Sequence, residues 1–278
     1  MRKHAIYVII VCKKEANNHV LNYAVKHKID YIDITKPYNE LVKAHDSIKH
    51  NLIDSKIVFS SGWMGVIAPS LLYSTGVLAK DIQSVKIMVY YSTKDKAGNS
   101  SAHFMAHNVS KPFVFYQNNA AKQTKHFLDG EETKFRFDNQ KRKVSDFDIP
   151  DLYIFNQIEQ IPNVRAKMTF DSKVVSAILP FMQKIGFFKI LGFKEKKRIF
   201  GINGDGDISS FEIIYSDAGS KENRIVLKCE EGQSKLTAFS TVLHVEKCLQ
   251  IQTQKAFILV ISCTIPKNLR IHYYQINQ

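Results

Sequence analysis

A short segment near residue 60 combines the residue types that bind anions at the start of a helix. Ser60-Ser61-Gly62-Trp63-Met64-Gly65 places two glycines and two hydroxyl groups between an apolar run and a helical pattern. Free backbone N–H groups at a helix N-terminus, together with the helix dipole, attract anions. A tight turn that needs glycine for its backbone angles explains the composition equally well. Both interpretations stay open, and Trp63, the only tryptophan, can equally be a buried apolar side chain.

Two other groups of residues have the residue types of a metal site or a phosphate-binding site, but not the spacing. His103 and His107 are one helical turn apart, the spacing of a zinc pair, but a glutamate after the first histidine and a third ligand are missing. The spacing of Gly201, Gly204 and Gly206 is the reverse of a phosphate-binding fingerprint and predicts a hairpin turn. We therefore expect no metal ion at the histidines and no phosphate at these glycines.

The charge and the cysteines restrict which partners the protein is expected to have and which cell compartment it is expected to occupy. The 278 residues carry a formal net charge of +13, but the lysines are spread out, with short basic runs only at 141–143 and 194–198. This distribution is typical of a solvated surface, so we expect an anionic small molecule as substrate and no nucleic-acid partner. No apolar run is long enough to cross a membrane, so no membrane partner is expected. Four cysteines without paired spacing indicate a reducing cytoplasm.

The segment around residue 60 belongs to a region in which predicted strands and helices alternate. Strands are predicted at residues 4–12, 31–34 and 56–59, and helices at residues 17–28, from Pro37 onward, and at 66–75, where Gly76 ends the last one. Alternating strands and helices are typical of a doubly wound parallel sheet. The fold class is therefore α/β, with a partial doubly wound, Rossmann-like parallel sheet over residues 1–80. Ligands of such sheets bind at the carboxyl ends of the strands.

The pattern changes to successive strands after residue 80. Strands are predicted at residues 85–91, 113–116, 133–137, 152–155, 164–170, 208–215, 224–228 and 255–264, followed by a polar tail. Helices are predicted at residues 98–109, 172–184 and 234–249, and a loop at 138–148. This order predicts an α+β domain with a largely antiparallel sheet over residues 81–278.

Several of these segments together resemble the saccharopine-dehydrogenase-like oxidoreductases. The segments are Tyr31-Ile32-Asp33-Ile34, the turn from Ser61 to Pro69, Lys96-Ala97-Gly98-Asn99-Ser100-Ser101 and the helical pattern from Ser234 to Leu249. The resemblance covers most of the chain. It implies a first domain that binds NAD or NADP and a second domain that closes over the substrate. It also implies an activity on amino acid or opine-like substrates, in which a secondary amine is formed or oxidised.

The resemblance assigns residues to a cofactor site and to a substrate site. The nicotinamide end of the cofactor would lie at Cys12, Ser61, Gly62, Trp63, Met64 and Gly65. The substrate would contact Asp95, Lys96, Gly98, Asn99 and Ser100, although a surface loop with a helix start at Asn99 or Ser100 explains that segment equally well. No residue stands out as the catalytic acid or base.

Two departures from the family pattern leave a second interpretation open. The Gly-x-Gly-x-x-Gly turn that contacts the cofactor pyrophosphate is missing, so the chain is expected to begin partway through the cofactor-binding domain. Met64 also stands where the family has a proline. The sequence therefore predicts either a truncated NAD(P)-dependent oxidoreductase of this type or a non-catalytic remnant that binds a ligand or oligomerises, for instance as a homodimer. A nucleic-acid-binding module ranks last.

Overall fold

The computed structural model of the chain describes residues 18–34, 36–51, 53–60, 62, 64–95, 98–201, 204–219, 221–250 and 271–277. These residues divide into two compact units. Unit 1 comprises Met1–Gly76, Ile149–Ile154 and Thr237–Thr264, and unit 2 comprises Val77–Asp148, Phe155–Leu236 and Ile265–Gln278. The predicted strands at residues 4–12 and 255–264 lie outside the described residues.

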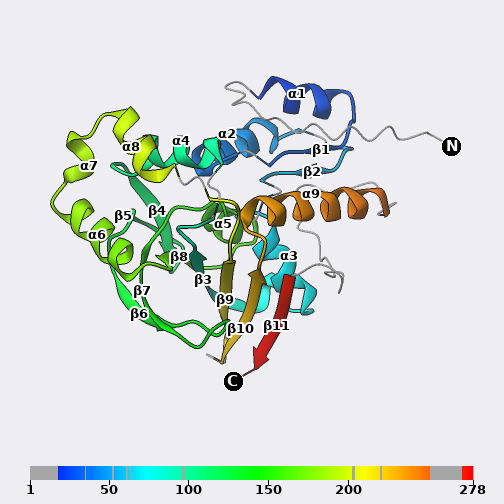
Figure 1. Cartoon of the computed structure of the whole chain (residues 1–278). Helices are drawn as coiled ribbons and strands as arrows, with labels where there is room; N and C mark the ends of the chain where they lie inside the picture. The colour runs from blue at the N-terminus through cyan, green and yellow to red at the C-terminus, as the bar shows by residue number, and fades with distance from the viewer. Residues whose placement is uncertain are drawn as a thin grey trace. The chain divides into compact units, whose positions relative to one another are not determined.

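Unit 1 contains a short parallel β–α–β arrangement. Strand β1 (Tyr31–Ile32) pairs in parallel with β2 (Ile57–Val58), and α2 (Tyr38–Ile48) lies between them in the chain. Helix α1 (His19–Lys26) precedes β1, and α3 (Ile67–Ser74) follows β2 (Figure 1). Gly76, at φ 83°, follows the end of α3 as predicted. The three predicted helices and the strands predicted at residues 31–34 and 56–59 are confirmed, and the described residues form a two-stranded parallel sheet rather than a larger Rossmann-like one.

The strand predicted at residues 152–155 is wrong, because this segment is helical. Helix α5 (Asp151–Tyr153) begins directly after Pro150 and continues into a π-helical turn over Ile154–Ile158. Every residue from 151 to 156 is buried. A short run that is buried on all sides shows neither the helical nor the strand period, so the pattern alone could not identify its secondary structure.

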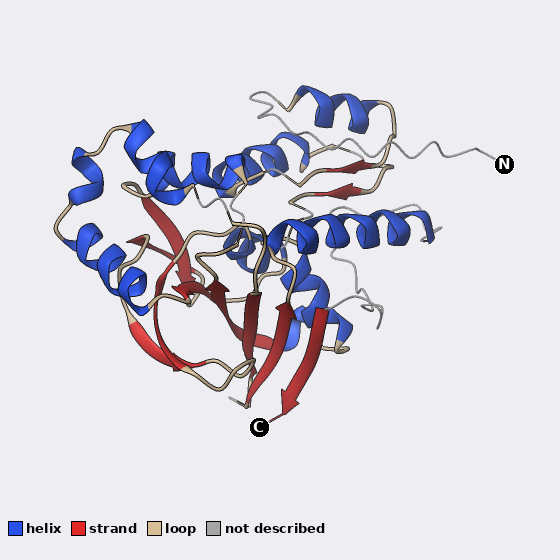
Figure 2. Ribbon diagram, viewed as in Figure 1, coloured by secondary structure: helices blue, strands red, loops and turns tan. Residues whose placement is uncertain are grey.

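Unit 2 is built on a large mixed sheet that is mostly antiparallel (Figure 2). Its strand order is β11-β10-β9-β3-β8-β4-β5, and β7 pairs with both β6 and β8. The pair of β3 and β8 is parallel, and the other pairs are antiparallel. The strands are β3 (Ile82–Tyr91), β4 (Pro112–Gln117), β5 (Ala120–Lys125), β6 (Glu131–Lys134), β7 (Lys141–Asp146), β8 (Asn163–Phe170), β9 (Ser209–Asp217), β10 (Glu222–Cys229) and β11 (Ile271–Asn277). The predicted antiparallel character of this region is confirmed.

The four central strands of the sheet have one apolar face. Residues that share this face in register are all buried: Val85, Ile87 and Val89 of β3, Val164 and Ala166 of β8, Phe211 and Ile213 of β9, and Ile225 and Leu227 of β10. Burial of such side chains contributes about 1.5–3 kcal/mol each, so this layer is a main source of stability.

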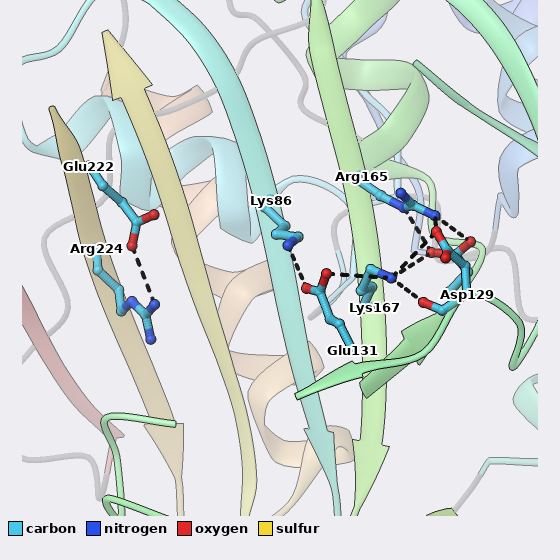
Figure 3. A network of polar contacts seen from close by, with 8 residues as sticks. Lys86, Asp129, Glu131, Arg165, Lys167, Glu222 and Arg224 are labelled. Atoms are coloured by element: carbon cyan, nitrogen blue, oxygen red, sulfur yellow. Dashed lines mark hydrogen bonds and ion pairs between the residues drawn. The ribbon is translucent and has the colours of Figure 1, made fainter. Parts of the chain in front are cut away.

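The opposite face of the sheet is covered by the β6–β7 hairpin and carries both a buried apolar cluster, which includes Met88, Tyr90 and Ile214, and a group of charged side chains. Figure 3 shows Lys167, which is 1% exposed, between Asp129 and Glu131. Its Nζ lies 3.3 Å from Oδ1 of Asp146, which also accepts a hydrogen bond from Arg165 at 2.8 Å. A buried cation is tolerated only when it is paired and hydrogen-bonded, as Lys167 is here. This charged network therefore attaches the hairpin to the sheet.

The remaining helices of unit 2 are α4 (Asn99–Asn108), α6 (Lys173–Lys184), α7 (Phe187–Ile190) and α8 (Phe193–Phe200), with a 3-10 turn at Ala79–Asp81 and the first turn of α9 (Gln233–Gln250). Among the described helices, none is long and apolar enough to cross a membrane. Strands β5 and β11 and helices α7 and α8 were not predicted, and the loop predicted at residues 138–148 contains β7 instead. β5 and the start of β7 are polar, so they lack the alternation that identifies a strand.

Candidate functional site

The turn that follows β2 in unit 1 has a backbone that requires glycine at its last position. Ser60 has φ 52° and Gly65 has φ 133°. A Cβ atom on Gly65 would lie 2.3 Å from the carbonyl oxygen of Ser60, which is closer than such atoms approach in proteins. That carbonyl accepts hydrogen bonds from the N–H groups of Gly62 at 2.6 Å and Val66 at 3.2 Å. The carbonyl of Ser60 thus closes the turn, and the N–H groups of Gly62 and Val66 are hydrogen-bonded within it.

The turn is tied to the end of β1 by a buried aspartate. Oδ1 of Asp33 accepts a hydrogen bond from the N–H of Ser60 at 3.2 Å, and the hydroxyl of Ser60 donates to the carbonyl of Lys36 at 2.6 Å. Asp33 and the Lys36 side chain are buried, and Nζ of Lys36 lies 3.9 Å from Oδ2 of Asp33. The carboxyl ends of both parallel strands therefore meet at one set of polar groups, as expected for this edge of a parallel sheet.

Asp151, also in unit 1, is the most perturbed carboxyl group close to this turn. It is 1% exposed, and within the described part of the chain neither carboxyl oxygen makes a hydrogen bond of normal geometry. Burial raises the pKa of Asp151 well above its ordinary value, while the backbone N–H groups of Gly65 and of Asp151 itself oppose that shift. A raised pKa favours the protonated carboxyl group, which can donate one hydrogen bond and accept another.

The residues assigned to the cofactor are only partly within the described chain. Gly62 and Gly65 are buried in the turn, and Met64 between them is partly buried. A Cβ atom on Gly62 would meet its nearest neighbour at 3.6 Å, so Gly62 is not required there for steric reasons. Cys12, Ser61 and Trp63 lie outside the described residues.

Asp95, assigned to the substrate, is buried in unit 2 and caps a helix. Its Oδ2 accepts hydrogen bonds from the hydroxyl of Ser209 at 2.7 Å and from the backbone N–H of Gln233, the first residue of α9, at 3.1 Å. Gly232, at φ 86°, leaves room for this carboxylate, because a Cβ atom there would lie 2.3 Å from Oδ1. A carboxylate at a helix N-terminus satisfies free N–H groups and favours the helix dipole. The carboxylate of Asp95 is therefore hydrogen-bonded within the protein and caps α9.

The loop that carries Asp95 is held by two further carboxylates. Thr93 donates to Asp171 through its N–H at 2.9 Å and through its hydroxyl at 3.2 Å. The hydroxyl of Ser92 donates to Asp207 at 2.6 Å. Because β3 and β8 are parallel, the loop after β3 and Asp171 after β8 come together at the same edge of the sheet. Among the described residues no three histidine, cysteine, aspartate or glutamate side chains are arranged to hold a metal ion.

The rest of the predicted substrate segment lies at the start of α4. Gly98 is the N-cap residue, and Gly98, Asn99 and Ser100 are exposed. Lys96 lies outside the described residues. Within the predicted substrate segment, Asp95 is thus a buried structural carboxylate, whereas residues 98–100 form an exposed helix start. The helix start at Asn99 was one of the two interpretations left open by the sequence.

Three histidines in the described units are buried or partly buried, and the sequence did not single them out. In unit 1, Nε2 of His244 lies 3.2 Å from the hydroxyl of Ser70, and burial lowers its pKa to about 4. His45 forms a 2.7 Å hydrogen bond with the hydroxyl of Tyr153, and burial lowers its pKa. In unit 2, His126 is fully buried among aromatic rings, and its pKa is lowered to about 3. Burial favours the neutral form of all three imidazoles, which is typical of histidines with a structural role.

Asp151 and Asp171 are the candidate residues that sequence reasoning missed. Asp151 lay in a segment that was predicted as a strand, and its proximity to Gly65 joins residues far apart in the chain. Asp171 does follow a correctly predicted strand, so the parallel pairing of β8 with β3 would have identified it. That pairing could not be deduced, because a largely antiparallel sheet was expected.

The site belongs to a mixed α/β protein with a parallel β–α–β arrangement and a mostly antiparallel sheet. Comparison with known proteins found no protein family model and no curated protein that matches the chain.

Proposed function

We propose that the protein is a saccharopine-dehydrogenase-like, NAD(P)-dependent oxidoreductase that acts on an amino acid or opine-like substrate. In this proposal the β1–α2–β2 arrangement belongs to a partial doubly wound sheet, and the turn after β2 faces the nicotinamide end of the cofactor. The observation that carries it is the turn itself: a glycine at φ 133°, at the carboxyl end of a parallel strand and directly before a helix. Cofactors of open α/β sheets bind at this edge.

The chemistry of the turn suits the nicotinamide better than a phosphate group. The N–H groups of Gly62 and Val66 already donate to Ser60, so they are not available to a phosphate oxygen. Burial raises the pKa of Asp151 and so favours its protonated carboxyl group, which could instead donate to and accept from a carboxamide, the group that the nicotinamide ring carries. Gly65, Ser60 and Asp151 would hold this end of the cofactor. When bound, the cofactor would supply hydride transfer, and the protein would supply orientation and the exclusion of water.

A second candidate function is a ligand-binding protein of the same fold without catalysis. It is favoured by Asp95, because the carboxylate assigned to the substrate is used to cap α9 and to bind Ser209. In that case the turn would bind a ligand, but no substrate would be turned over. Both candidate functions predict that a ligand binds at the turn, but only the oxidoreductase would convert a substrate.

The test is titration of the protein with NADPH, NADH and reduced nicotinamide mononucleotide, followed by the fluorescence of Trp63. Saturable quenching in the micromolar range by all three is expected, because the proposed contact is with the nicotinamide end. Absence of quenching up to millimolar concentrations would overturn the proposal. Consumption of NADPH with an amino acid and a 2-oxo acid distinguishes the oxidoreductase from the non-catalytic candidate.

A matched pair of variants tests the role of Asp151 in that binding. Asp151→Asn keeps one hydrogen-bond donor and one acceptor and should bind the cofactor like the wild type. Asp151→Leu removes both and should weaken binding about tenfold or more. Equal weakening in both variants, or in neither, would contradict the proposed contact with the carboxamide.

A further inference from the structure

The outward face of α6 in unit 2 is apolar. Val174, Ile178, Phe181 and Ile185 follow the spacing of one helix face and are 65%, 48%, 62% and 59% exposed, and Ile190 of α7 is 80% exposed. We call these five residues the α6–α7 apolar surface. Seven of the eleven large apolar side chains that are exposed in the described chain lie between Val174 and Ile199. Contiguous apolar surface of this kind marks an interaction site.

The inner face of α6 is fixed by specific contacts, so the exposed face is a defined surface. Leu179 and Gln183 are buried, and Nε2 of Gln183 donates to the carbonyl of Val109 at 2.7 Å. Ser172 caps the helix by accepting from the N–H of Val175 at 3.3 Å. A helix on the surface of a water-soluble domain normally has its polar residues outside, but α6 has a buried glutamine and an exposed phenylalanine.

The segment after α6 is anchored in the same way. Phe188 of α7 is fully buried, and its carbonyl accepts a hydrogen bond from the hydroxyl of Ser110 at 2.7 Å. Phe193 of α8 packs against His103 and His107 of α4, with ring centroids 4.9 Å and 4.5 Å apart. Figure 1 shows α6, α7 and α8 following one another along one side of the sheet of unit 2. The anchoring leaves Ile190 directed outward.

Positive charge accompanies the α6–α7 apolar surface. Residues 173–200 contain seven lysine and arginine side chains and a single acidic residue, Glu195. Lys173, Lys184 and Lys189, which belong to α6 and α7, are all exposed. Apolar side chains with lysines beside them are the composition of helices that lie in the interface of an anionic membrane.

We propose that the α6–α7 apolar surface docks on the surface of an anionic lipid membrane. The apolar side chains would enter the boundary between headgroups and acyl chains, while the lysines contact the lipid phosphates and carboxylates. A helix in this position lies along the membrane and needs no membrane-spanning segment. The inference does not depend on the proposed oxidoreductase activity.

A second copy of the chain is the competing occupant, and the charges argue against it. In a symmetric dimer each surface would meet the same surface of its partner, so the lysines of α6 and α7 would face like charges. An anionic lipid surface offers the opposite sign. The charge distribution therefore favours the membrane over a homodimer at this face.

The experiment is co-sedimentation of the full chain with vesicles of phosphatidylcholine alone and with vesicles in which about one third is phosphatidylserine. Binding only to the anionic vesicles, weakened by high salt, is expected. The double variant Phe181→Ser/Ile185→Ser should lose about tenfold or more in partitioning, since it removes two apolar side chains without changing the charge. Lys184→Gln should lose about fivefold.

The matched control is Leu78→Ser, which removes an apolar side chain of unit 2 that is 55% exposed and lies outside the α6–α7 apolar surface. It should bind like the wild type. Thermal unfolding of each variant checks that the fold is retained, as expected for exposed positions. No binding to anionic vesicles, or binding that Phe181→Ser/Ile185→Ser leaves unchanged, would overturn the proposal. A concentration-dependent dimer that the double variant abolishes, without lipid binding, would assign the surface to a second copy instead.

Discussion

His126 provides a test of how the interior of unit 2 responds to acid. Its imidazole is fully buried, and the rings of Phe113 and Phe147 lie 5.0 Å and 5.1 Å from it, with Phe104 and Phe127 slightly further away. Within the described chain neither ring nitrogen has a hydrogen-bond partner. Burial lowers the pKa of His126 from 6.5 to about 3, so the folded protein holds it neutral in mildly acidic solution.

The sign of the effect follows from the proton balance. Between pH 6.5 and about 3 the unfolded chain binds a proton at His126 that the folded protein excludes. Acid therefore favours the unfolded state in this window, by about 1.4 kcal/mol for each pH unit below 6.5. At pH 5 the loss from this residue amounts to about 2 kcal/mol of unfolding free energy. Above pH 6.5 His126 contributes no pH dependence.

The perturbation is His126→Phe, measured by urea unfolding at pH 7.5, 6 and 5. The stability of the variant relative to wild type should rise by about 2 kcal/mol between pH 7.5 and pH 5, whatever the packing cost of the larger ring at neutral pH. Phe147→Leu, a change in the same aromatic cluster without a titrating group, should keep a constant difference from wild type. A difference between His126→Phe and wild type that is the same at all three pH values would refute the reasoning.

Two other predictions concern unit 1. Gly65→Ala should lower the free energy of unfolding by about 3 kcal/mol or more, because φ 133° and the approach to Ser60 both exclude a Cβ atom, whereas Gly62→Ala should cost about 1 kcal/mol or less. Equal losses in urea unfolding would contradict this distinction. Asp151→Asn should gain stability over wild type as pH rises above 3.8, the ordinary pKa of aspartate, since the pKa of Asp151 is raised in the folded state and the unfolded chain loses the proton first. Parallel pH profiles of the two proteins would show that Asp151 ionises normally.

The strongly patterned elements could be predicted from the sequence, and the polar or fully buried ones could not. The amphipathic spacing of α2 and α6, and the apolar runs of β3 and β8, identified those elements correctly. β5 has exposed or partly exposed residues throughout, and it forms only because β4 provides an antiparallel partner. Tertiary pairing, which sequence periods do not encode, decides the structure of such segments.

The candidate site divides in the same way. The turn from Ser60 to Gly65 could be located because glycines between a strand pattern and a helix pattern indicate a backbone conformation that other residues rarely adopt. Asp95 was recognised as a polar residue, but its capping of α9 depends on a contact with Gln233, 138 residues later. The approach of Asp151 to Gly65 also depends on the fold of the whole unit. Long-range hydrogen-bond partners of this kind cannot be derived from spacing.

The central position of β3 has a consequence for the order of events during synthesis. One edge of β3 pairs with β8 at residues 163–170, and the other pairs with β9 at residues 209–217. The β8 residues that pair with β3 lie 79 positions later in the chain (Ser84 with Asn163), and the β9 residues lie 118 (Tyr91 with Ser209) to 135 (Ile82 with Asp217) positions later, so both edges stay unpaired until those residues have been synthesised. Pairing over such sequence distances is slow, because loop closure must precede the contacts that offset its entropy. The nascent chain thus exposes an apolar strand for much of its translation, and its folding yield should depend on chaperones that shield unpaired strands.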